Sequence, residues 1–418
     1  MGKILTLISF FVILICLSAK QSQAQNAPVH TPRVLVIGID PTDSNGASLA
    51  NTYFRGAMSG ADSATFELTH AQQTMNDFKD LSRGRIQYVL AGHLHLTSFP
   101  RYTNGYQFSV QNYAQCVWGR PEFNPTQCET QKWLFPYVQY VQEQQICQQA
   151  KAVNADEIWI YSPPYILAYE AFMIGPTAGF FVNGPDYTVV ECEKHYIVVN
   201  AAYDTPNNLL HSYGHRIEST IDYLMRNFSA SDRIRYWERF SARTEATRTS
   251  GSAFCGNVHF PFNYRFEYDY AAPTAKQSTC ADFANFPNYT GAQTTQECSA
   301  WGCTDRGWEK YWFSFIPDNT GTTTIVDRTG RSYAFKNDWW YYLLYPENAL
   351  RSESGVFPSQ CLEDISGDGF IDISDYSILL THFLTSVPAG TPADINADGF
   401  IDISDYSLLV RKFLTPCS

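Results

Sequence analysis

The sequence predicts an α/β fold with a mixed, mostly parallel sheet, followed by a small all-α module at the C-terminus. Two patterns predict it. Strand-like apolar runs alternate with helix-like segments over residues 30–355, and a duplicated loop–helix pattern occupies residues 361–417. The chain has 418 residues, of which 44% are hydrophobic and only 17% charged, so it can bury a sizeable core.

Residues 1–24 are typical of an export signal peptide. Lys3 provides the positive charge, residues 4–17 form an apolar stretch, and Ala24 ends a run of small residues at a cleavage site. The apolar stretch is too short to span a bilayer comfortably, and no later stretch is long enough either. We therefore expect no membrane span and a mature chain that is secreted, either free or attached to a cell surface or scaffold.

Strands and helices alternate along the large domain. Strands are predicted at 33–39, 85–96, 157–162 and 195–200, and helices at 135–152 and 208–227. From residue 244 to 346 the chain is rich in Gly, Asn, Trp and Cys, so we expect long disulfide-pinned loops packed over the sheet. Sites in such folds lie beyond the carboxyl ends of the strands. The sequence contains no glycine-rich nucleotide loop, GxSxG elbow or HExxH motif.

The cysteines favour disulfides over thiol chemistry. Of eleven cysteines, Cys16 lies in the export signal, and the ten that remain contain no CxxC pair. An even number of cysteines in an exported chain is typical of structural disulfides. Because Cys361 and Cys417 bracket the C-terminal module, we expect them to form a disulfide with each other.

The charge balance argues against a nucleic-acid partner. The chain carries 29 Lys and Arg against 41 Asp and Glu, which gives a formal net charge of −12, and it has no basic run. Binding to phosphates requires clustered cations. Aromatic residues reach 15%, which fits a protein that handles sugars and fits a rigid core equally well.

A candidate site lies on the helix predicted at 208–227. His211, His215 and Glu218 have the spacing that places side chains on one helix face. A pair of histidines four residues apart is the spacing with which zinc proteases hold their metal, although Ser212 stands here in place of their catalytic Glu. Three interpretations stay open: a zinc site, a metal-free catalytic or substrate-binding role, and a hydrogen-bonded structural cluster.

A pair of carboxylates is a further candidate. Glu170 follows the strand predicted at 157–162, where α/β folds keep catalytic groups. With Glu218 or Asp269 it would form an acid–base pair, and His215 is the remaining catalytic candidate.

The loop from Cys255 to Tyr270 is a candidate substrate subsite. Asn257, His259 and Asn263 are expected to bind substrate there, because amides read sugar hydroxyls and neighbouring rings stack on sugars. The same composition also fits a well-packed disulfide loop.

Two further histidines alternate along the strand predicted at 85–96. His93 and His95 therefore share one face of that strand. The tetrapeptide from Gly92 resembles the last motif of metallophosphoesterases, but the earlier motifs of that family are missing. The preferred interpretation is a half-buried strand face.

The C-terminal module contains two copies of a calcium loop. The sequence that begins at Asp364 recurs from Asp394, and each copy has oxygen ligands at loop positions 1, 3, 5, 9 and 12, a backbone carbonyl at position 7 and a glycine at position 6. Hard oxygen donors in this order are typical of EF-hand loops. The expected ligands of two calcium ions are Asp364, Ser366, Asp368, Phe370, Asp372 and Asp375, and Asp394, Asn396, Asp398, Phe400, Asp402 and Asp405.

Because each loop is followed by one helix and has Asp at position 12, the module resembles the type I dockerin domain. The resemblance implies calcium-dependent folding and binding to a cohesin domain of a scaffold or cell-surface protein. The positions that read the partner in that family correspond here to Ile373, Ser374, Ile403 and Ser404. The repetition of the same pair in both copies implies two symmetric binding modes.

Most dockerins are carried by enzymes that degrade plant cell-wall or other polysaccharides, so the resemblance implies that the large domain of this chain is such an enzyme. We therefore expect a secreted carbohydrate-active hydrolase that cleaves glycosidic bonds of a polysaccharide. Two alternatives stay open. One is a metal-dependent peptidase or esterase that uses His211, His215 and Glu218, and the other is a non-catalytic glycan-binding or structural component.

Overall fold

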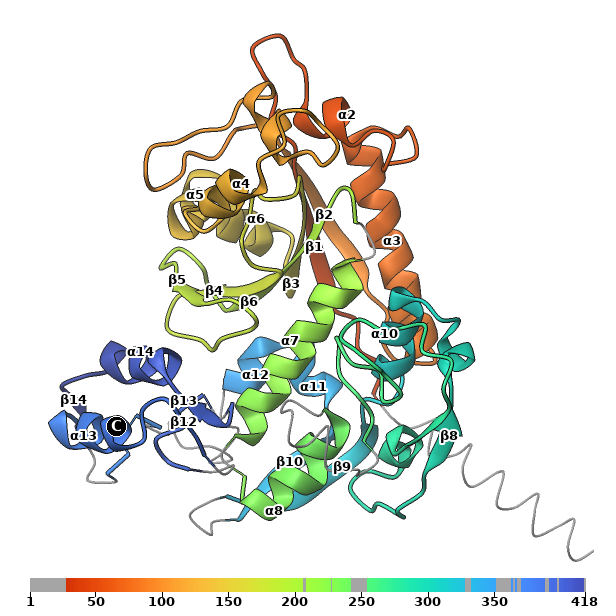
Figure 1. Cartoon of the computed structure of the whole chain (residues 1–418), viewed down its shortest axis with the longest axis vertical. Coiled ribbons are helices and arrows are strands. Elements are labelled where there is room, and N and C mark those ends of the chain that lie inside the picture. The colour runs from red at the N-terminus through yellow and green to blue at the C-terminus, as the bar shows by residue number, and fades with distance from the viewer. Residues whose placement is uncertain are drawn as a thin grey trace, which may run out of the picture.

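The computed structural model describes residues 28–205, 208–226, 228–241, 254–327, 332–350, 362–363, 365–366, 370–387, 391–396 and 398–416 (Figure 1). The expected signal peptide, the expected Cys361–Cys417 disulfide and two of the expected calcium ligands, Asp364 and Asp368, lie outside these residues.

A six-stranded mixed sheet forms the centre of the large domain, which confirms the predicted α/β class. Its strands follow the order β2-β1-β3-β6-β4-β5, and all neighbours pair in parallel except β4 and β6. The strands are β1 (Arg33–Ile39), β2 (Val89–Leu96), β3 (Glu157–Ser162), β4 (Ala171–Gly175), β5 (Asp186–Thr188) and β6 (Tyr196–Ala202). Since β2 follows β1 on one side and β3 lies on the other, the direction of winding changes between β1 and β3.

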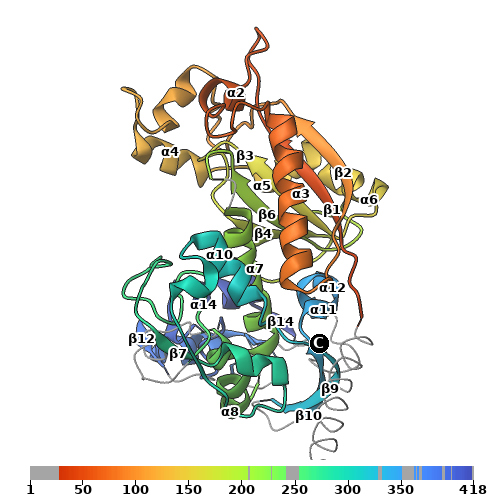
Figure 2. The same cartoon turned by 90° about the vertical axis from the view of Figure 1, so that its right-hand side faces the viewer.

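Helices cover both faces of this sheet (Figures 1 and 2). The two long ones, α3 (Ser63–Leu81) and α7 (Asn208–Met225), pack on one face, α3 against β1 and β2 and α7 against β6 and β4. The other face is covered by α5 (Tyr137–Glu143) and α6 (Ile146–Ala152). The single helix expected at 135–152 is therefore two, because Gln145 adopts a left-handed backbone conformation with φ 52°.

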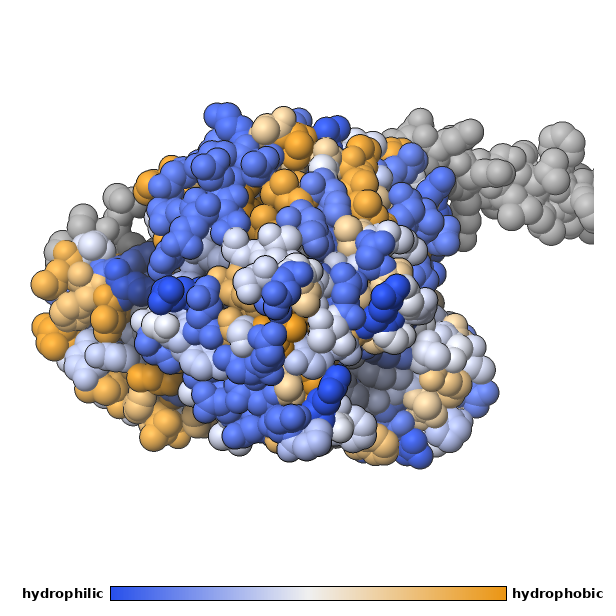
Figure 3. All heavy atoms as spheres, turned by 90° about the horizontal axis from the view of Figure 1, so that it is seen from above, coloured by the Kyte–Doolittle hydropathy of each residue, from blue (hydrophilic) through white to orange (hydrophobic). Residues whose placement is uncertain are grey.

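Shorter helices connect these layers. Two of them precede β3 in the chain, α2 (Leu49–Tyr53) and α4 (Pro125–Lys132). After α7 they are α8 (Ala230–Arg233), α10 (Asp305–Phe313), α11 (Trp340–Leu343) and α12 (Pro346–Leu350). Seen from the end that carries α2 and α4, the molecule has hydrophilic and hydrophobic residues interspersed over its surface (Figure 3).

Four disulfides are present among the described residues: Cys116–Cys128, Cys147–Cys192, Cys255–Cys280 and Cys298–Cys303. Two of them pin the region expected to consist of long loops. This region is more regular than expected, because it also contains α10, the hairpin β7 (Lys276–Ser278) and β8 (Thr294–Gln296), and the antiparallel pair β9 (Asp318–Val326) and β10 (Ser332–Asp338). In α10, Trp308 and Trp312 are four residues apart and both buried, so burial of one helix face explains this element.

The C-terminal module is built from two matching loop–helix units. Its helices α13 (Ile373–Thr381) and α14 (Ile403–Arg411) each begin with a capping box, Asp372 with Asp375 and Asp402 with Asp405. Two short antiparallel pairs join the copies: β11 (Phe370–Ile371) with β14 (Thr415–Pro416), and β12 (Thr385–Ser386) with β13 (Phe400–Ile401). The module has its own core, formed by Leu362, Ile371, Leu379, Ala393, Ile395, Ile401 and Leu409.

A buried ion pair fixes α7 on the sheet. The guanidinium of Arg216 on α7 donates to the carboxylate of Glu157 on β3, and both side chains are fully buried. Arg216 also donates to the carbonyl of Leu343 at 2.5 Å, and Trp159 Nε1 donates to Glu157 at 2.7 Å. Removing one partner of such a pair leaves an uncompensated charge in the core.

We predict that Arg216→Met destabilises the large domain by about 3–5 kcal/mol, because Glu157 keeps its buried carboxylate without a counter-charge. Guanidinium unfolding followed by tryptophan fluorescence measures this loss. The matched control is the double variant Glu157→Leu/Arg216→Met, which removes both charges and is expected to recover most of the loss. A loss below about 1 kcal/mol in the single variant would contradict the prediction.

Candidate functional site

Three histidines come together at the first turns of α7. His211 and His215 lie one helical turn apart on this helix, and His259 reaches them from the loop that follows Cys255. One ring nitrogen of each histidine lies within 4.8 Å of the others. The sequence predicted that His211 and His215 share one helix face, whereas His259 was expected to bind substrate.

The loop that carries His259 is fixed by short contacts. Asn257 Oδ1 accepts from the backbone N–H groups of His259 and Phe260 at 3.0 and 2.9 Å, which closes a tight turn. The N–H of Val258 donates to Glu218 at 3.1 Å, and this contact ties the loop to α7. The side chains of Asn257 and Glu218 therefore hold the loop in place beside the two helical histidines.

Each histidine of the cluster has a carboxylate at its Nδ1 atom. His211 Nδ1 lies 3.0 Å from Glu309, His215 Nδ1 lies 3.3 Å from Glu218, and His259 Nδ1 lies 3.0 Å from Glu267. Because a carboxylate only accepts hydrogen bonds, these contacts favour the tautomer with the proton on Nδ1. Nε2 of His215 and Nε2 of His259 then lie on the sides of the two rings that approach each other.

The spacing of these nitrogens suits a tetrahedral metal ion. Nε2 of His215 and Nε2 of His259 are 3.2 Å apart. Zn–N bonds of 2.0–2.1 Å at tetrahedral angles separate two ligand atoms by about 3.3 Å. Carboxylates that accept from the outer nitrogen of each ligand are the usual outer shell of zinc-binding histidines. The donor set and the outer shell therefore both fit zinc.

Glu170 lies beside the histidine cluster, immediately before β4. One of its oxygens is 3.1 Å from His215 Nε2 and accepts from Asn183 Nδ2 at 2.9 Å. Burial by itself would raise the pKa of Glu170, but the hydrogen bond from His215 and the charges of the histidines lower it to about 2. Glu170 is therefore a carboxylate fixed in its ionised form at the edge of the cluster.

The pKa values of the three histidines shift in different directions. Burial lowers the pKa of His211 and of His259, and the positive charge of His215 lowers both further. For His215, the hydrogen bonds to Glu170 and Glu218 outweigh burial and raise the pKa to about 9. Without a metal, His215 is therefore the histidine of the cluster that holds a positive charge, whereas His211 and His259 stay neutral.

Tyr268 completes the arrangement from the same loop as His259. Its backbone has φ 63°, a left-handed conformation that is strained for a bulky residue. This conformation brings the hydroxyl to 3.2 Å from His259 Nε2 and the ring to 4.4 Å from the imidazole. A hydroxyl donor therefore faces the space between the histidines.

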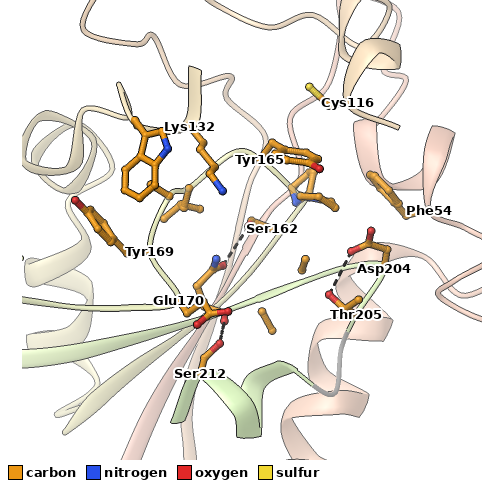
Figure 4. A pocket seen from close by; sticks show the side chains of 18 of the residues that line it. Phe54, Cys116, Lys132, Ser162, Tyr165, Tyr169, Glu170, Asp204, Thr205 and Ser212 are labelled. Atoms are coloured by element: carbon orange, nitrogen blue, oxygen red, sulfur yellow. Dashed lines mark hydrogen bonds between the residues drawn. The ribbon is translucent and has the colours of Figure 1, made fainter. Parts of the chain in front are cut away.

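A cavity of about 490 Å³ opens on the other side of Glu170. It lies beyond the carboxyl ends of β3 and β6, since Ser162 and the segment 200–202 line it, and this is the position expected for sites in α/β sheets. In Figure 4, Glu170, Tyr165, Tyr169 and Asp204 surround the same space. Glu170 is shared between the cavity and the histidine cluster.

Two predicted site residues have other partners in the structure. Asp269 forms a bidentate ion pair with Arg265 at 2.6 and 2.9 Å, and Asn263 Nδ2 donates to the carbonyls of Ala272 and Thr274. Neither residue lines the cavity.

A second histidine group involves the strand histidines predicted to lie on a half-buried face. The buried carboxylate of Glu67 on α3 accepts from His93 at 2.6 Å, from Tyr203 at 2.6 Å and from His95 at 3.3 Å. Gly38 makes room for it, because a Cβ there would lie 2.0 Å from the Glu67 carboxyl carbon. Because one buried carboxylate accepts these three contacts, we interpret the network as a structural cluster.

In the second loop of the C-terminal module, acidic side chains converge as a calcium site requires. Asp394 accepts from the backbone of Asp398 and Gly399, and Asp405 accepts from that of Asn396. Burial, together with the charges of the neighbouring Asp398 and Asp405, raises the pKa of Asp394 to about 7. Bound calcium relieves such repulsion. In the first loop the described ligand residues occupy matching places, with Asp375 accepting from the backbone of Ser366.

The residues expected to read a partner lie at the starts of the two helices. Ile373 and Ile403 are 62% and 61% exposed, although both are large apolar side chains. Each is followed by its serine, Ser374 and Ser404, whose N–H groups donate to the helix-capping aspartates. The two copies therefore present the same pair in the same local geometry.

None of the described helices is long and apolar enough to cross a membrane. No curated protein matches the chain. A solved structure described as a chaperone–substrate complex is similar over 45% of this chain and 23% of that one, with a TM-score of 0.22 and 9% identity, and a likeness this weak supports no conclusion. The model of the dockerin type I domain matches residues 362–414. The C-terminal module is therefore a type I dockerin domain, which implies calcium and a cohesin partner.

Proposed function

We propose that the large domain is a metal-dependent hydrolase of ester or amide bonds, with one zinc ion held by His211, His215 and His259. The observation that supports it most is the set of three carboxylates, one at each Nδ1 atom, which leaves the Nε2 atoms as the ring nitrogens that would hold the ion. Three protein ligands leave a fourth position open for water or substrate, as in catalytic zinc sites.

When bound, the ion would lower the pKa of a water molecule to about 7 and polarise the substrate carbonyl. Glu170 is the general base in this proposal: its ionised carboxylate takes a proton from the attacking water and passes it to the leaving oxygen or nitrogen. The new carbon–oxygen bond forms as the bond to the leaving group breaks. Tyr268 donates its hydroxyl proton in a hydrogen bond to the carbonyl oxygen as negative charge develops there.

A metal-free glycosidase that acts on polysaccharide is the second candidate, and it keeps the function expected from the sequence. It is favoured by two carboxylates at one cavity whose pKa values shift in opposite directions. The pKa of Glu170 is lowered to about 2, whereas desolvation raises that of Asp204. A pair of this kind suits a base and an acid. Asp204 would then take the role that the sequence gave to Glu218 or Asp269.

The dockerin domain supplies the second part of the proposed function. We propose that it attaches the hydrolase to a cohesin domain of an extracellular scaffold or surface protein, with Ile373, Ser374, Ile403 and Ser404 at the interface. Secretion is supported by the four disulfides, which persist in oxidising compartments.

The first prediction concerns the metal. Full-length protein freed of zinc with 1,10-phenanthroline in excess calcium should take up one zinc ion per chain and regain hydrolysis of acetyl esters or peptides. His211→Ala and His259→Ala should each abolish tight zinc binding, measured by calorimetry and elemental analysis. His93→Ala, in the second histidine group, is the matched control. Polysaccharide cleavage that survives zinc removal would favour the glycosidase instead.

The second prediction separates catalysis from positioning. Glu170→Gln should lower kcat by about 10²–10⁴-fold with unchanged zinc content, because only the base is lost. Glu218→Gln should weaken zinc binding by about 10–100-fold, because His215 loses the acceptor that orients its ring. Parallel zinc titrations and initial rates check both outcomes. Equal loss of zinc in the two variants would contradict the assigned roles.

The third prediction concerns calcium in the dockerin domain. Asp394→Ala/Asp405→Ala removes two ligands of the second loop, so the bound calcium should fall from two ions to one. Ser407→Ala, which alters an exposed residue of the same helix, is the control. Calcium titration by calorimetry measures the stoichiometry. Retention of two ions would contradict the ligand assignment.

A further inference from the structure

The chain has nine tryptophans, and two of them differ from all the others. Trp118 is 85% exposed and Trp133 is 56% exposed, and both line the cavity next to Glu170. The remaining seven are buried: Trp159, Trp237, Trp301, Trp308, Trp312, Trp339 and Trp340. A large exposed aromatic ring is unusual, and two at one cavity indicate a surface that binds a ligand.

These rings are held in place by the segment between β2 and α5. The Cys116–Cys128 disulfide closes this segment next to Trp118. Lys132 Nζ lies 5.6 Å from the centre of the Trp133 ring and 5.7 Å from that of Tyr165, and Trp133 meets Tyr169 edge to face at 5.4 Å. A ring fixed by such contacts loses little entropy when a ligand packs on it.

Polar side chains also line the cavity. Ser162, Asn183, Asn200 and Thr205 contribute hydroxyl and amide groups to its lining, and Ser162 Oγ donates to Asn200 Oδ1 at 3.1 Å. The cavity thus combines flat aromatic faces with side chains that both donate and accept hydrogen bonds. Its volume of about 490 Å³ lies within the range of small-molecule sites.

The charged residues of the lining limit which class of ligand the cavity can bind. Among the described residues that line the cavity, Lys132 is the only cation, and it is paired with Glu129 at 2.8 Å. Glu170 and Asp204 add two carboxyl groups to the lining. A phosphorylated or uronic-acid ligand would meet net repulsion here, whereas an uncharged ligand would not.

We propose that this cavity is a subsite for a neutral pyranose unit of a glycan chain, which packs on Trp133 and Trp118. A pyranose presents C–H groups on its faces and hydroxyls around its edge, which matches the rings and the amides of this lining. Because Glu170 belongs to both cavity and histidine cluster, the proposal deepens the proposed function. The bond that is hydrolysed would be an acyl ester or amide carried by a sugar.

Binding is tested on full-length protein without zinc and with calcium, so that no turnover occurs. Neutral hexasaccharides of xylose, glucose and N-acetylglucosamine, and an unrelated hexapeptide, are titrated by calorimetry and by tryptophan emission. At least one saccharide should bind and shift the emission to shorter wavelength, because only Trp118 and Trp133 are exposed. Trp133→Ala should weaken this binding at least tenfold, and Phe266→Ala, an exposed aromatic outside the lining, should leave it unchanged.

Two outcomes would overturn the proposal. One is binding of the peptide, dependent on Trp133, with no binding of any saccharide, and the other is saccharide binding that Trp133→Ala does not weaken. Neither depends on zinc, so failure here leaves the metal-dependent hydrolase standing. Conversely, saccharide binding at Trp133 together with no zinc uptake would reject the metal centre and keep the subsite.

Discussion

The ion pair between Arg216 and Glu157 is the constraint on which the candidate site depends. It joins α7 to the centre of the sheet, where both side chains are fully buried, so separating the two charges would leave each unpaired in the core. Arg216 follows His215 directly in the chain. With the guanidinium directed into the sheet, the neighbouring imidazole is directed away from it, toward Glu170 and the loop that carries His259. A buried charge pair thus determines the rotation of the helix that supplies two of the three histidines.

The histidine cluster is built in the same manner, through acidic partners that orient basic groups. Glu309 comes from α10, Glu218 from α7 and Glu267 from the His259 loop, so three separate elements must dock before the rings converge. The second histidine group shows the contrast. There a single carboxylate, Glu67, accepts from His93, His95 and Tyr203. The two groups differ in where the carboxylates lie: one carboxylate stands at the centre of the group around Glu67, whereas three carboxylates lie around His211, His215 and His259, at their Nδ1 atoms.

Local patterns in the sequence predicted most of the scaffold. Apolar periodicity predicted β1, β2, β3, β6 and the α7 segment, and ligand spacing that repeats in register predicted the dockerin domain, but β4, β5 and the long helix α3 were not predicted. The site was only half predictable. His211 and His215 share a helix, so their spacing reveals them, but His259, Tyr268 and Glu309 meet them through tertiary packing that leaves no local signal. The break of the 135–152 helix at Gln145 had the same origin, because that residue adopts a left-handed conformation imposed by its surroundings.

The dockerin domain and the histidine cluster offer different donors, which would keep calcium and the proposed zinc ion at separate sites. The dockerin loops offer carboxylate, amide and hydroxyl oxygens, which suit calcium, whereas the histidine cluster offers imidazole nitrogens, which suit zinc. Calcium has little affinity for imidazole, so excess calcium can hold the dockerin folded while zinc is removed. Zinc loss would then silence hydrolysis without releasing the chain from a cohesin partner. In these proposals attachment depends on residues of the dockerin domain alone, whereas the sugar subsite and the histidine cluster share Glu170.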